Sequence, residues 1–145
     1  MITYQTFDTN FSFKGRRFTS SWLRQVVQTE KRMIGDIGIQ FCSDEHILSV
    51  NKEFLHHDYY TDVITFDYCE GDVISGDLVI SVDSVADNAS HFHTEFEEEL
   101  NRVIVHGVLH LLGYDDHTLE DQKVMREKEN FYLEVRHKLL CDAGK

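Results

Sequence analysis

The sequence predicts one α/β (α+β) domain in which a small mixed sheet packs against a central helix. Apolar residues alternate with polar ones in short segments and recur at helical spacing in others, in the order strand, helix, strand, helix, strand, strand, helices. The predicted helix of residues 94–112 begins with acidic turns and becomes apolar on nearly every side in its second half, apart from two histidines. Such a helix is buried on most sides, so we expect the sheet to cover it.

Composition favours a single folded unit over residues 1–145. A chain of 145 residues with 41% hydrophobic and 12% aromatic residues can bury one sizeable core, and no linker, repeat or low-complexity tract divides it. The N-terminus lacks a signal pattern, and no stretch approaches the roughly 20 apolar residues that span a bilayer, so we expect a cytoplasmic protein. The cysteines, Cys42, Cys69 and Cys141, are odd in number and form no C-x-x-C pair, which argues against a disulfide framework or a thiolate zinc site.

The N-terminal third is expected to supply a strand, a helix and a second strand. Alternation over residues 2–7 and 11–13 predicts a short edge strand or hairpin. The Thr-Ser-Ser run at residues 19–21 offers an N-cap for a helix whose apolar stripe extends to Gly35, where the helix stops. Residues 37–41 alternate again and predict the next strand.

The middle of the chain is expected to form a helix followed by two neighbouring strands. Residues 43–55 predict a helix capped by its leading serine. Residues 62–68 and 74–82 predict two strands, separated by a turn at residues 71–72. Gly76 interrupts the second strand, which indicates either a bulge or a close backbone approach.

The C-terminal third predicts three helices. A short one extends over about residues 83–91. Residues 94–97 have the form of a capping box, which begins the longer helix that extends to Leu112. Thr118, with Asp121 three residues later, caps the last helix.

Charge is unevenly distributed along the chain. The net charge of −12 argues against unselective attraction to nucleic-acid phosphates. Residues 1–32 are locally basic, with only Asp8 and Glu30 opposing six cations. A basic N-terminal face that meets phosphates and a solvated helix face with a charged turn are both consistent with this pattern. The six cations are Lys14, Arg16, Arg17, Arg24, Lys31 and Arg32.

A pair of histidines predicts a metal site on the central helix. His106 and His110 are four residues apart in an apolar run and so lie on nearly the same side of the helix. Gly113 is expected to end the helix with a left-handed cap, after which the chain turns back with Asp-Asp-His at residues 115–117. Burial of both imidazoles without partners would be costly, so the pattern favours an open zinc site with a third ligand from the turn.

The spacing from His106 to Asp116, H-x-x-x-H-x-x-G-x-x-D, is similar to the zinc-binding pattern of metzincin proteases. Those enzymes place a glutamate beside the first histidine as general base, whereas this chain has Gly107. A peptidase mechanism is therefore disfavoured. Gly107 permits either a close approach of backbone or substrate, or helix packing.

Two blocks of the chain resemble the YbeY family over about residues 48–133. The first block is H-G-x-L-H-L-x-G-Y-D, followed by M-x-x-x-E, whose methionine lies nine residues after the third ligand position. Its residues here are His106, Gly107, Leu109, His110, Leu111, Gly113, Tyr114, Asp115, Met125 and Glu129. The second block lies upstream and comprises Asn51, Asp58, Thr61, Asp62, Val63, Ile64 and Phe66, followed by Gly76-Asp77.

The resemblance implies a metzincin-like α/β fold in which a central helix lies against a mixed four-stranded sheet. It implies a zinc-dependent, single-strand-specific endoribonuclease with one Zn²⁺ per chain. That enzyme would act in maturation of the 3′ end of small-subunit (16S) ribosomal RNA and in ribosome quality control. Its expected partners are ribosomal RNA, the small ribosomal subunit and a ribosome-associated GTPase.

The third metal ligand departs from the family pattern. In the family it is normally a histidine six residues after the second ligand, and that position here is Asp116. Counting back nine residues from Met125 gives the same position. Asp116 is therefore the predicted ligand, and His117 is a neighbour that substitutes for it or orients a hydrogen bond.

A second departure concerns the phosphate-binding group. Leu55 stands where many family members carry an arginine, and Tyr60 replaces the usual proline. A charge-stabilising role is then open to His56, His57 or a basic residue elsewhere.

No catalytic base is evident from the sequence. Asp62, Asp115 and His117 are candidates, and an adjacent 2′-hydroxyl of the RNA could be the nucleophile instead. The rival hypothesis is a non-catalytic ribosome-assembly factor that binds the small subunit or a GTPase and uses a structural metal to hold the turn after residue 112. A metal-dependent hydrolase of another small substrate is the third hypothesis.

Overall fold

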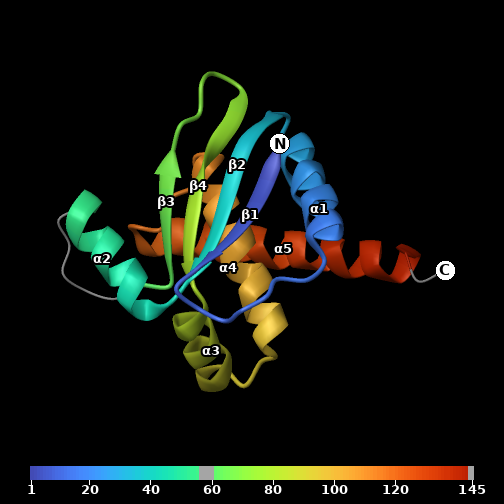
Figure 1. Ribbon diagram of the computed structural model, residues 1–145. Coiled ribbons are helices and arrows are strands. Elements are labelled where there is room, and N and C mark those ends of the chain that lie inside the picture. Colours follow the sequence, from blue (N-terminus) through green and yellow to red (C-terminus); the bar gives the residue numbers. More distant parts are fainter. Residues whose placement is uncertain (56–60, 144–145) are drawn as a thin grey trace.

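The structure, a computed structural model, describes residues 1–55 and 61–143 (Figure 1). That part of the chain forms four strands, β1 (Ile2–Phe7), β2 (Met33–Cys42), β3 (Val63–Asp67) and β4 (Val73–Ser81). It also forms five helices, α1 (Arg16–Thr29), α2 (Asp44–Leu55), α3 (Val82–His91), α4 (Phe96–Leu111) and α5 (Leu119–Ala143). No helix in these ranges combines the length and apolarity needed to cross a membrane.

The strands form one mixed sheet in the order β1-β2-β4-β3. β2 pairs in parallel with β1 and β4, whereas β3 pairs antiparallel with β4. The predicted pairing of the third and fourth strands is confirmed, with Thr65 opposite Leu78. The four-stranded mixed sheet implied by the family resemblance is confirmed as well.

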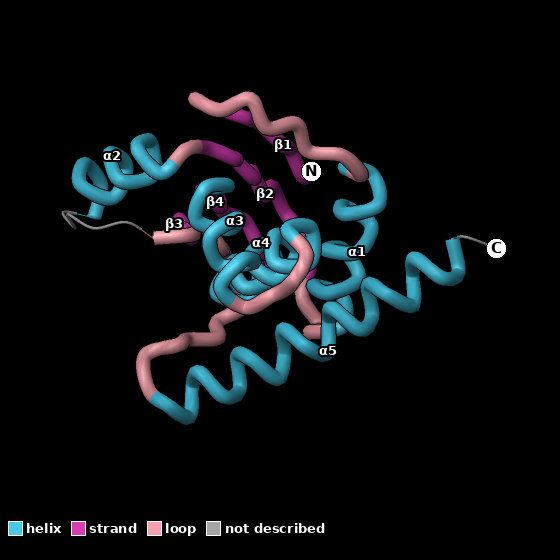
Figure 2. The backbone as a smooth tube through the Cα atoms, turned by 90° about the horizontal axis from the view of Figure 1, so that it is seen from below, coloured by secondary structure: helices cyan, strands magenta, loops and turns pink. Residues whose placement is uncertain are grey.

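Helices cover one face of the sheet in two layers (Figure 2). α1 and α4 lie against the sheet, and α5 crosses on the far side of these two helices. Ile37, Ile39 and Phe41 point from β2 into this core, which confirms the predicted alternation. The Trp22 indole Nε1 donates a hydrogen bond of 2.9 Å to the Tyr132 carbonyl, which ties α1 to α5. α2 packs against β3 and β4 around a second, smaller cluster of buried residues.

The second half of α4 is buried between the sheet and α5, as its composition predicts. Val105, Val108 and Leu109 are fully buried, whereas His106 and His110 are only half-buried. The apolar surroundings fix the helix, and the two imidazoles reach its accessible edge. The core therefore holds the histidine pair rigidly without enclosing it.

Helix α1 begins and ends earlier than the sequence predicts. It starts at Arg16 after Gly15, which adopts a left-handed φ of 80°, so the residues expected to cap it lie inside its first turns. It ends at Thr29, and Met33 already belongs to β2, where its N–H donates to the Asp72 carbonyl at 2.9 Å. Sheet pairing thus overrides the helical spacing of the residues before Gly35.

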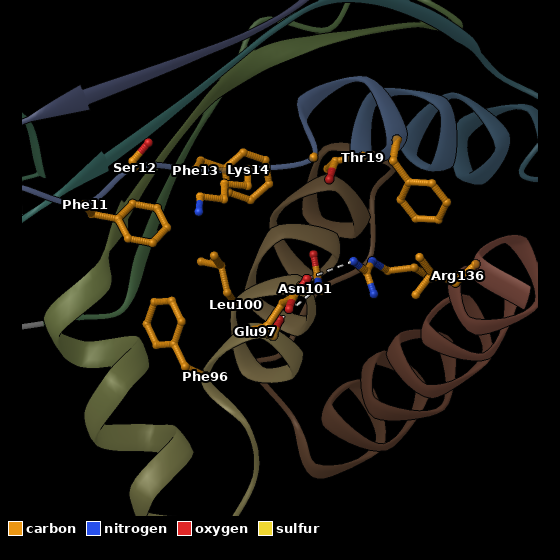
Figure 3. A pocket seen from close by; sticks show the side chains of 13 residues that line it. Phe11, Ser12, Phe13, Lys14, Thr19, Phe96, Glu97, Leu100, Asn101 and Arg136 are labelled. Carbon is orange, nitrogen blue, oxygen red and sulfur yellow. Dashed lines mark hydrogen bonds and ion pairs between the residues drawn. The ribbon is translucent and has the colours of Figure 1, made fainter. Parts of the chain in front are cut away.

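The alternation of residues 11–13 predicts part of an edge strand or hairpin, but these residues belong to no strand of the sheet. Phe13 instead stacks on Phe41 with ring centroids 4.8 Å apart, and Phe11 meets Phe41 edge to face at 5.2 Å. Phe11 also meets Phe96 at 5.8 Å (Figure 3). The apolar alternation of this segment therefore reflects aromatic packing against the core rather than strand pairing.

Two of the N-caps predicted for the later helices form, and one does not. Ser43 accepts from the His46 N–H at 3.2 Å, and Thr118 Oγ1 accepts from the Asp121 N–H at 3.0 Å, as predicted. The capping box expected at residues 94–97 does not form, because Glu95 occupies the N-cap position without a side-chain hydrogen bond. The acidic first turn of α4 still complements the helix dipole.

Gly76 lies where β3, β4 and α4 meet and where a side chain has no room. A Cβ at this position would lie 2.4 Å from the Phe66 carbonyl oxygen and 2.7 Å from Leu111 Cδ2. The bulge next to it belongs to β2, between Ile34 and Ile37. Close approach, the second of the two predicted explanations, therefore accounts for this glycine.

We expect Gly76→Ala to lower the free energy of unfolding by about 3 kcal/mol, because a backbone carbonyl cannot move away from the added methyl group. Urea unfolding measures the loss. Gly38→Ala in β2 is the matched control, since its Cβ would meet Asp77 Oδ1 at 2.5 Å, the end of an exposed side chain that can rotate away. Equal losses in the two variants would contradict the steric explanation.

Candidate metal centre

Helix α4 brings the two predicted histidines together. The ring centroids of His106 and His110 lie 4.6 Å apart with the rings nearly perpendicular, at 82°. Their Nε2 atoms approach to 3.1 Å. Two imidazole nitrogens therefore face the same point beside the helix.

The chain reverses after α4 through a left-handed glycine. Gly113 has a φ of 104°, and its N–H donates to the His110 carbonyl at 3.0 Å. The Tyr114 N–H donates to the Leu109 carbonyl at 3.0 Å, which completes a Schellman motif. The predicted cap is confirmed, and it directs the following residues back towards the histidines.

Asp116 completes a group of three potential ligands. Its Oδ2 lies 3.5 Å from His106 Nε2 and 3.6 Å from His110 Nε2, and the three ligand atoms lie within 4.8 Å of one another. Around a tetrahedral zinc ion with ligand distances of about 2.0–2.1 Å, ligand atoms lie about 3.4 Å apart. The observed triangle matches these dimensions, so the group can hold a metal ion.

His117 and Asp115 lie outside this triangle. Both side chains are exposed, and neither belongs to the group of ligand atoms formed by the described residues. His117 does line a cavity beside the histidines. The structure therefore places Asp116 among the potential ligands and His117 next to them.

Glu129 of α5 orients His106 from behind. Its buried carboxylate places Oε2 2.7 Å from His106 Nδ1, while Oε1 accepts a bond of 2.9 Å from Arg102 Nη1. An ionised carboxylate accepts a hydrogen bond from the protonated Nδ1. The other ring nitrogen, Nε2, then carries the lone pair, which is directed at the triangle. The sequence marked Glu129 only through the Met-x-x-x-Glu match and assigned it no role.

The two histidines differ in how readily they take a proton. Burial lowers the pKa of His106, but the Glu129 hydrogen bond and charge, together with Asp116 and Asp62, outweigh burial and raise it. Burial and the neighbouring His106 lower the pKa of His110. A metal ligand must be deprotonated, so a bound cation would displace the proton that His106 holds at lower pH.

A second polar cluster anchors the turn that carries Asp116. The Tyr114 hydroxyl donates to Glu30 Oε1 at 2.6 Å, and Lys128 Nζ lies 3.2 Å from Glu30 Oε2. The Tyr132 hydroxyl donates to the same carboxylate. These hydrogen bonds lower the pKa of Glu30 against the opposing effect of its burial. The end of α1, the turn and α5 are thereby tied together.

The triangle lies where two cavities meet. One, of about 470 Å³, lies between α3, α4 and α5, and the other, of about 610 Å³, lies beside β3. Asp62, His106 and Asp116 line both cavities. A metal ion held here would therefore be open to a substrate, as catalytic sites require.

The remaining predicted residues lie in four different places. Gly107 packs on β4, where an added Cβ would lie 2.8 Å from Leu78 Cδ2, so helix packing explains it. Met125 is buried in the core and also lines the 470 Å³ cavity. Leu55 lines the larger cavity and provides no charge there. The segment with His56, His57, Asp58 and Tyr60 lies outside the described residues.

A third cavity, of about 420 Å³, lies at the opposite end of α4 (Figure 3). Four phenylalanines are among its lining residues, and the guanidinium of Arg136 lies over Phe18, 5.4 Å from the ring centroid. Lys14 of the basic N-terminal region lines this cavity. Among the described residues that line the two cavities at the histidines, none comes from residues 1–32. The N-terminal basic residues therefore do not border the candidate metal centre.

Fold and site together define a class of small α/β proteins in which a helix-borne histidine pair and a following carboxylate can hold a metal ion. The sequence profile of the family described as endoribonuclease YbeY matches residues 2–136. The endoribonuclease YbeY of Bacteroides fragilis is 48% identical over 135 residues, which cover 93% of this chain and 97% of the relative. That of Parabacteroides distasonis is 48% identical over 134 residues, 92% of this chain and 94% of the relative. The chain belongs to the endoribonuclease YbeY family.

A solved structure shows the same fold. The solution structure of TM1509 from Thermotoga maritima superimposes with a TM-score of 0.69 at 30% sequence identity. The match covers 99% of this chain and 93% of that protein. The family resemblance and the predicted fold class are confirmed.

Proposed function

We propose that this protein is a zinc-dependent, single-strand-specific endoribonuclease that acts in maturation of the 3′ end of 16S ribosomal RNA and in ribosome quality control. Endoribonuclease is the activity named for the family and for its Bacteroides fragilis member. The observation that carries the proposal is the triangle of His106, His110 and Asp116 at the junction of two cavities. Residues 1–145 act as one functional unit in the cytoplasm, where the RNA is found.

One Zn²⁺ per chain is the proposed metal, with His106, His110 and Asp116 as ligands and His117 as a neighbour. Two imidazoles and a carboxylate suit zinc among the divalent ions, and three protein ligands leave a fourth position open. Bound zinc would supply a Lewis acid for a phosphoryl oxygen or lower the pKa of a water molecule towards about 7. The chain's own part is to orient the ligands through Glu129 and through the turn that Tyr114 anchors.

The third ligand is tested by comparing Asp116→Ala with His117→Ala. We expect Asp116→Ala to lower zinc affinity by roughly 100-fold or more and His117→Ala to change it less than tenfold, since only Asp116 lies within the triangle. Competition with a chromophoric chelator measures both affinities. The reverse order would make His117 the third ligand. Wild-type zinc affinity in both variants would show that the third ligand does not come from this turn.

We assign proton transfer to Asp62. Asp62 lines both cavities, accepts a hydrogen bond of 3.2 Å from Asn88 Nδ2, and has a raised pKa because of its burial. Asp115, by contrast, is exposed. The nucleophile can be identified from the chemical form of the new RNA end. Attack by a 2′-hydroxyl yields a 2′,3′-cyclic phosphate, whereas attack by water does not.

The non-catalytic assembly factor is the second candidate function. Leu55 in the cavity wall, where the family commonly has a phosphate-binding arginine, favours it. The turn, however, is already held by backbone hydrogen bonds and by the Tyr114–Glu30 contact, which reduces the need for a structural metal. Ribosomal RNA, the small subunit and a ribosome-associated GTPase are proposed partners under both functions.

The deciding experiment follows a precursor of 16S ribosomal RNA incubated with the zinc-loaded protein, alone and within small subunits. The endoribonuclease cuts it near the mature 3′ end. If the RNA stays intact while the protein binds the subunits, the assembly-factor function replaces the proposed one.

A further inference from the structure

We propose that Arg126 forms a phosphate subsite in the 470 Å³ cavity, where it binds the RNA phosphodiester next to the scissile one. The subsite rests on the proposed endoribonuclease function and deepens it. Leu55 supplies no positive charge at the 610 Å³ cavity, and the subsite provides such a charge from α5 instead.

The position of Arg126 fits this role because it shares a cavity with the candidate metal group. Arg126 lies on the first turns of α5, opposite His106 on α4 and Asp116 on the turn, and all three line the same space. An RNA strand whose scissile phosphate lies at the triangle can therefore pass Arg126 with an adjacent phosphate. Guanidinium groups bind phosphate through two parallel hydrogen bonds, which fixes position as well as charge.

Arg126 differs from Arg102, the other cation in the cavity wall. Arg102 is committed to structure, since Nη1 donates to Glu129 Oε1 and Nη2 to Asn130 Oδ1, both at 2.9 Å. Arg126 is 57% exposed, and its ion pair with Glu129 Oε1 spans 3.7 Å, beyond hydrogen-bond distance. That oxygen already accepts from Arg102. The Arg126 guanidinium is thus held loosely at a surface where a better acceptor can replace Glu129.

The charges around the cavity favour a cation as a contact for RNA. Carboxylates outnumber arginines in its wall, and each would repel a phosphate that entered. A bound divalent metal offsets part of that charge at the triangle. Arg126 adds a positive charge that is open to solvent in the same wall, and without it Arg102 is the one arginine left there among the described residues. The four carboxylates are those of Asp62, Glu99, Asp116 and Glu129.

Three variants of the zinc-loaded protein test the subsite: Arg126→Ala, Arg126→Lys and Lys138→Ala. Lys138 is the matched control because it is an exposed cation on the same helix, more than three turns away from Arg126. The probe is a short single-stranded 2′-O-methyl RNA, checked on a gel to be uncut. Fluorescence anisotropy gives its Kd over a range of salt concentrations, and the zinc content of each variant is measured in parallel.

Arg126→Ala is expected to raise the Kd roughly tenfold at low salt and to reduce the slope of log K against log salt by about 0.7, the value for one lost phosphate contact. Arg126→Lys should keep the slope but recover only part of the affinity, because lysine lacks the bidentate geometry. Lys138→Ala should behave as the wild type, and zinc content should be unchanged in all three.

Other results overturn the subsite in distinguishable ways. Wild-type affinity and slope in Arg126→Ala, with RNA cleavage by the wild type intact, would refute the subsite and leave the endoribonuclease function standing. Loss of zinc from Arg126→Ala would make Arg126 a residue that positions the metal group. A wild type that neither binds nor cuts RNA would refute the proposed function and the subsite together.

Discussion

Replacing His110 by alanine is expected to abolish stoichiometric zinc binding and to lower RNA cleavage by roughly 10³-fold or more. His110 contributes one of three potential ligand atoms that lie within 4.8 Å of one another. Its loss leaves two ligands, too few for a catalytic zinc site. Loss of a metal that contributes several kcal/mol to transition-state stabilisation corresponds to at least three decades in rate. Metal analysis and initial cleavage rates measure the two effects.

The variant should remain folded, because the His110 ring is half-buried at the helix edge and the core residues of α4 are unchanged. Circular dichroism and urea unfolding of the metal-free proteins check this point. His137→Ala, an exposed histidine on α5, is the control and should retain zinc and activity. Full zinc occupancy in His110→Ala would show that the metal lies elsewhere.

The second large effect is expected at Glu129. In Glu129→Gln the amide can still accept from Arg102 through its oxygen, but its NH₂ group then faces His106 Nδ1 and donates to it. The imidazole proton moves to Nε2, the atom that faces the triangle, and that tautomer cannot ligate a metal. We expect zinc affinity to fall 10–100-fold, the usual effect of losing a carboxylate behind a histidine ligand.

Glu129→Ala should also destabilise the metal-free protein, by about 3 kcal/mol, because it removes the partner of the half-buried Arg102 and leaves its charge uncompensated. Chelator competition and urea unfolding separate the two effects. Glu127→Gln, an exposed position on the same helix, should change neither quantity. Unchanged zinc affinity in Glu129→Gln would remove Glu129 from the metal centre.

The half of the site that is local in sequence could be predicted from sequence. His106 and His110 meet because helical geometry brings residues four apart to one side, and Gly113 turns the chain because glycine accepts a positive φ. Asp116 follows from the ligand spacing of the family that the chain resembles, counted in both directions. The first two inferences need only the geometry of a few consecutive residues.

The parts that depend on tertiary packing could not be predicted in this way. Glu129 reaches His106 from another helix, 23 residues further along, and Glu30 meets Tyr114 across 84 residues. Glu129 stands out in the sequence only through the Met-x-x-x-Glu match, which gives it no role, and no sequence pattern marks Glu30. Only the packing of α1 and α5 around α4 reveals their contacts.

The same distinction explains the errors in the predicted elements. Helical spacing before Gly35 predicts a helix, but a hydrogen bond from Met33 to Asp72, 39 residues away, starts β2 earlier. Alternation at Phe11 and Phe13 predicts a strand, but both rings pack against Phe41. In both cases a contact between distant segments outweighs the local pattern.

Removal and return of zinc tests the central hypothesis most directly. Wild-type protein is stripped with a chelator, divided, and assayed on precursor 16S ribosomal RNA with and without one equivalent of zinc, with His110→Ala treated in parallel. We predict cleavage near the mature 3′ end only in the zinc-restored wild type. Equal cleavage by the stripped and restored wild type, or by His110→Ala, would contradict a metal-dependent endoribonuclease centred on His106, His110 and Asp116.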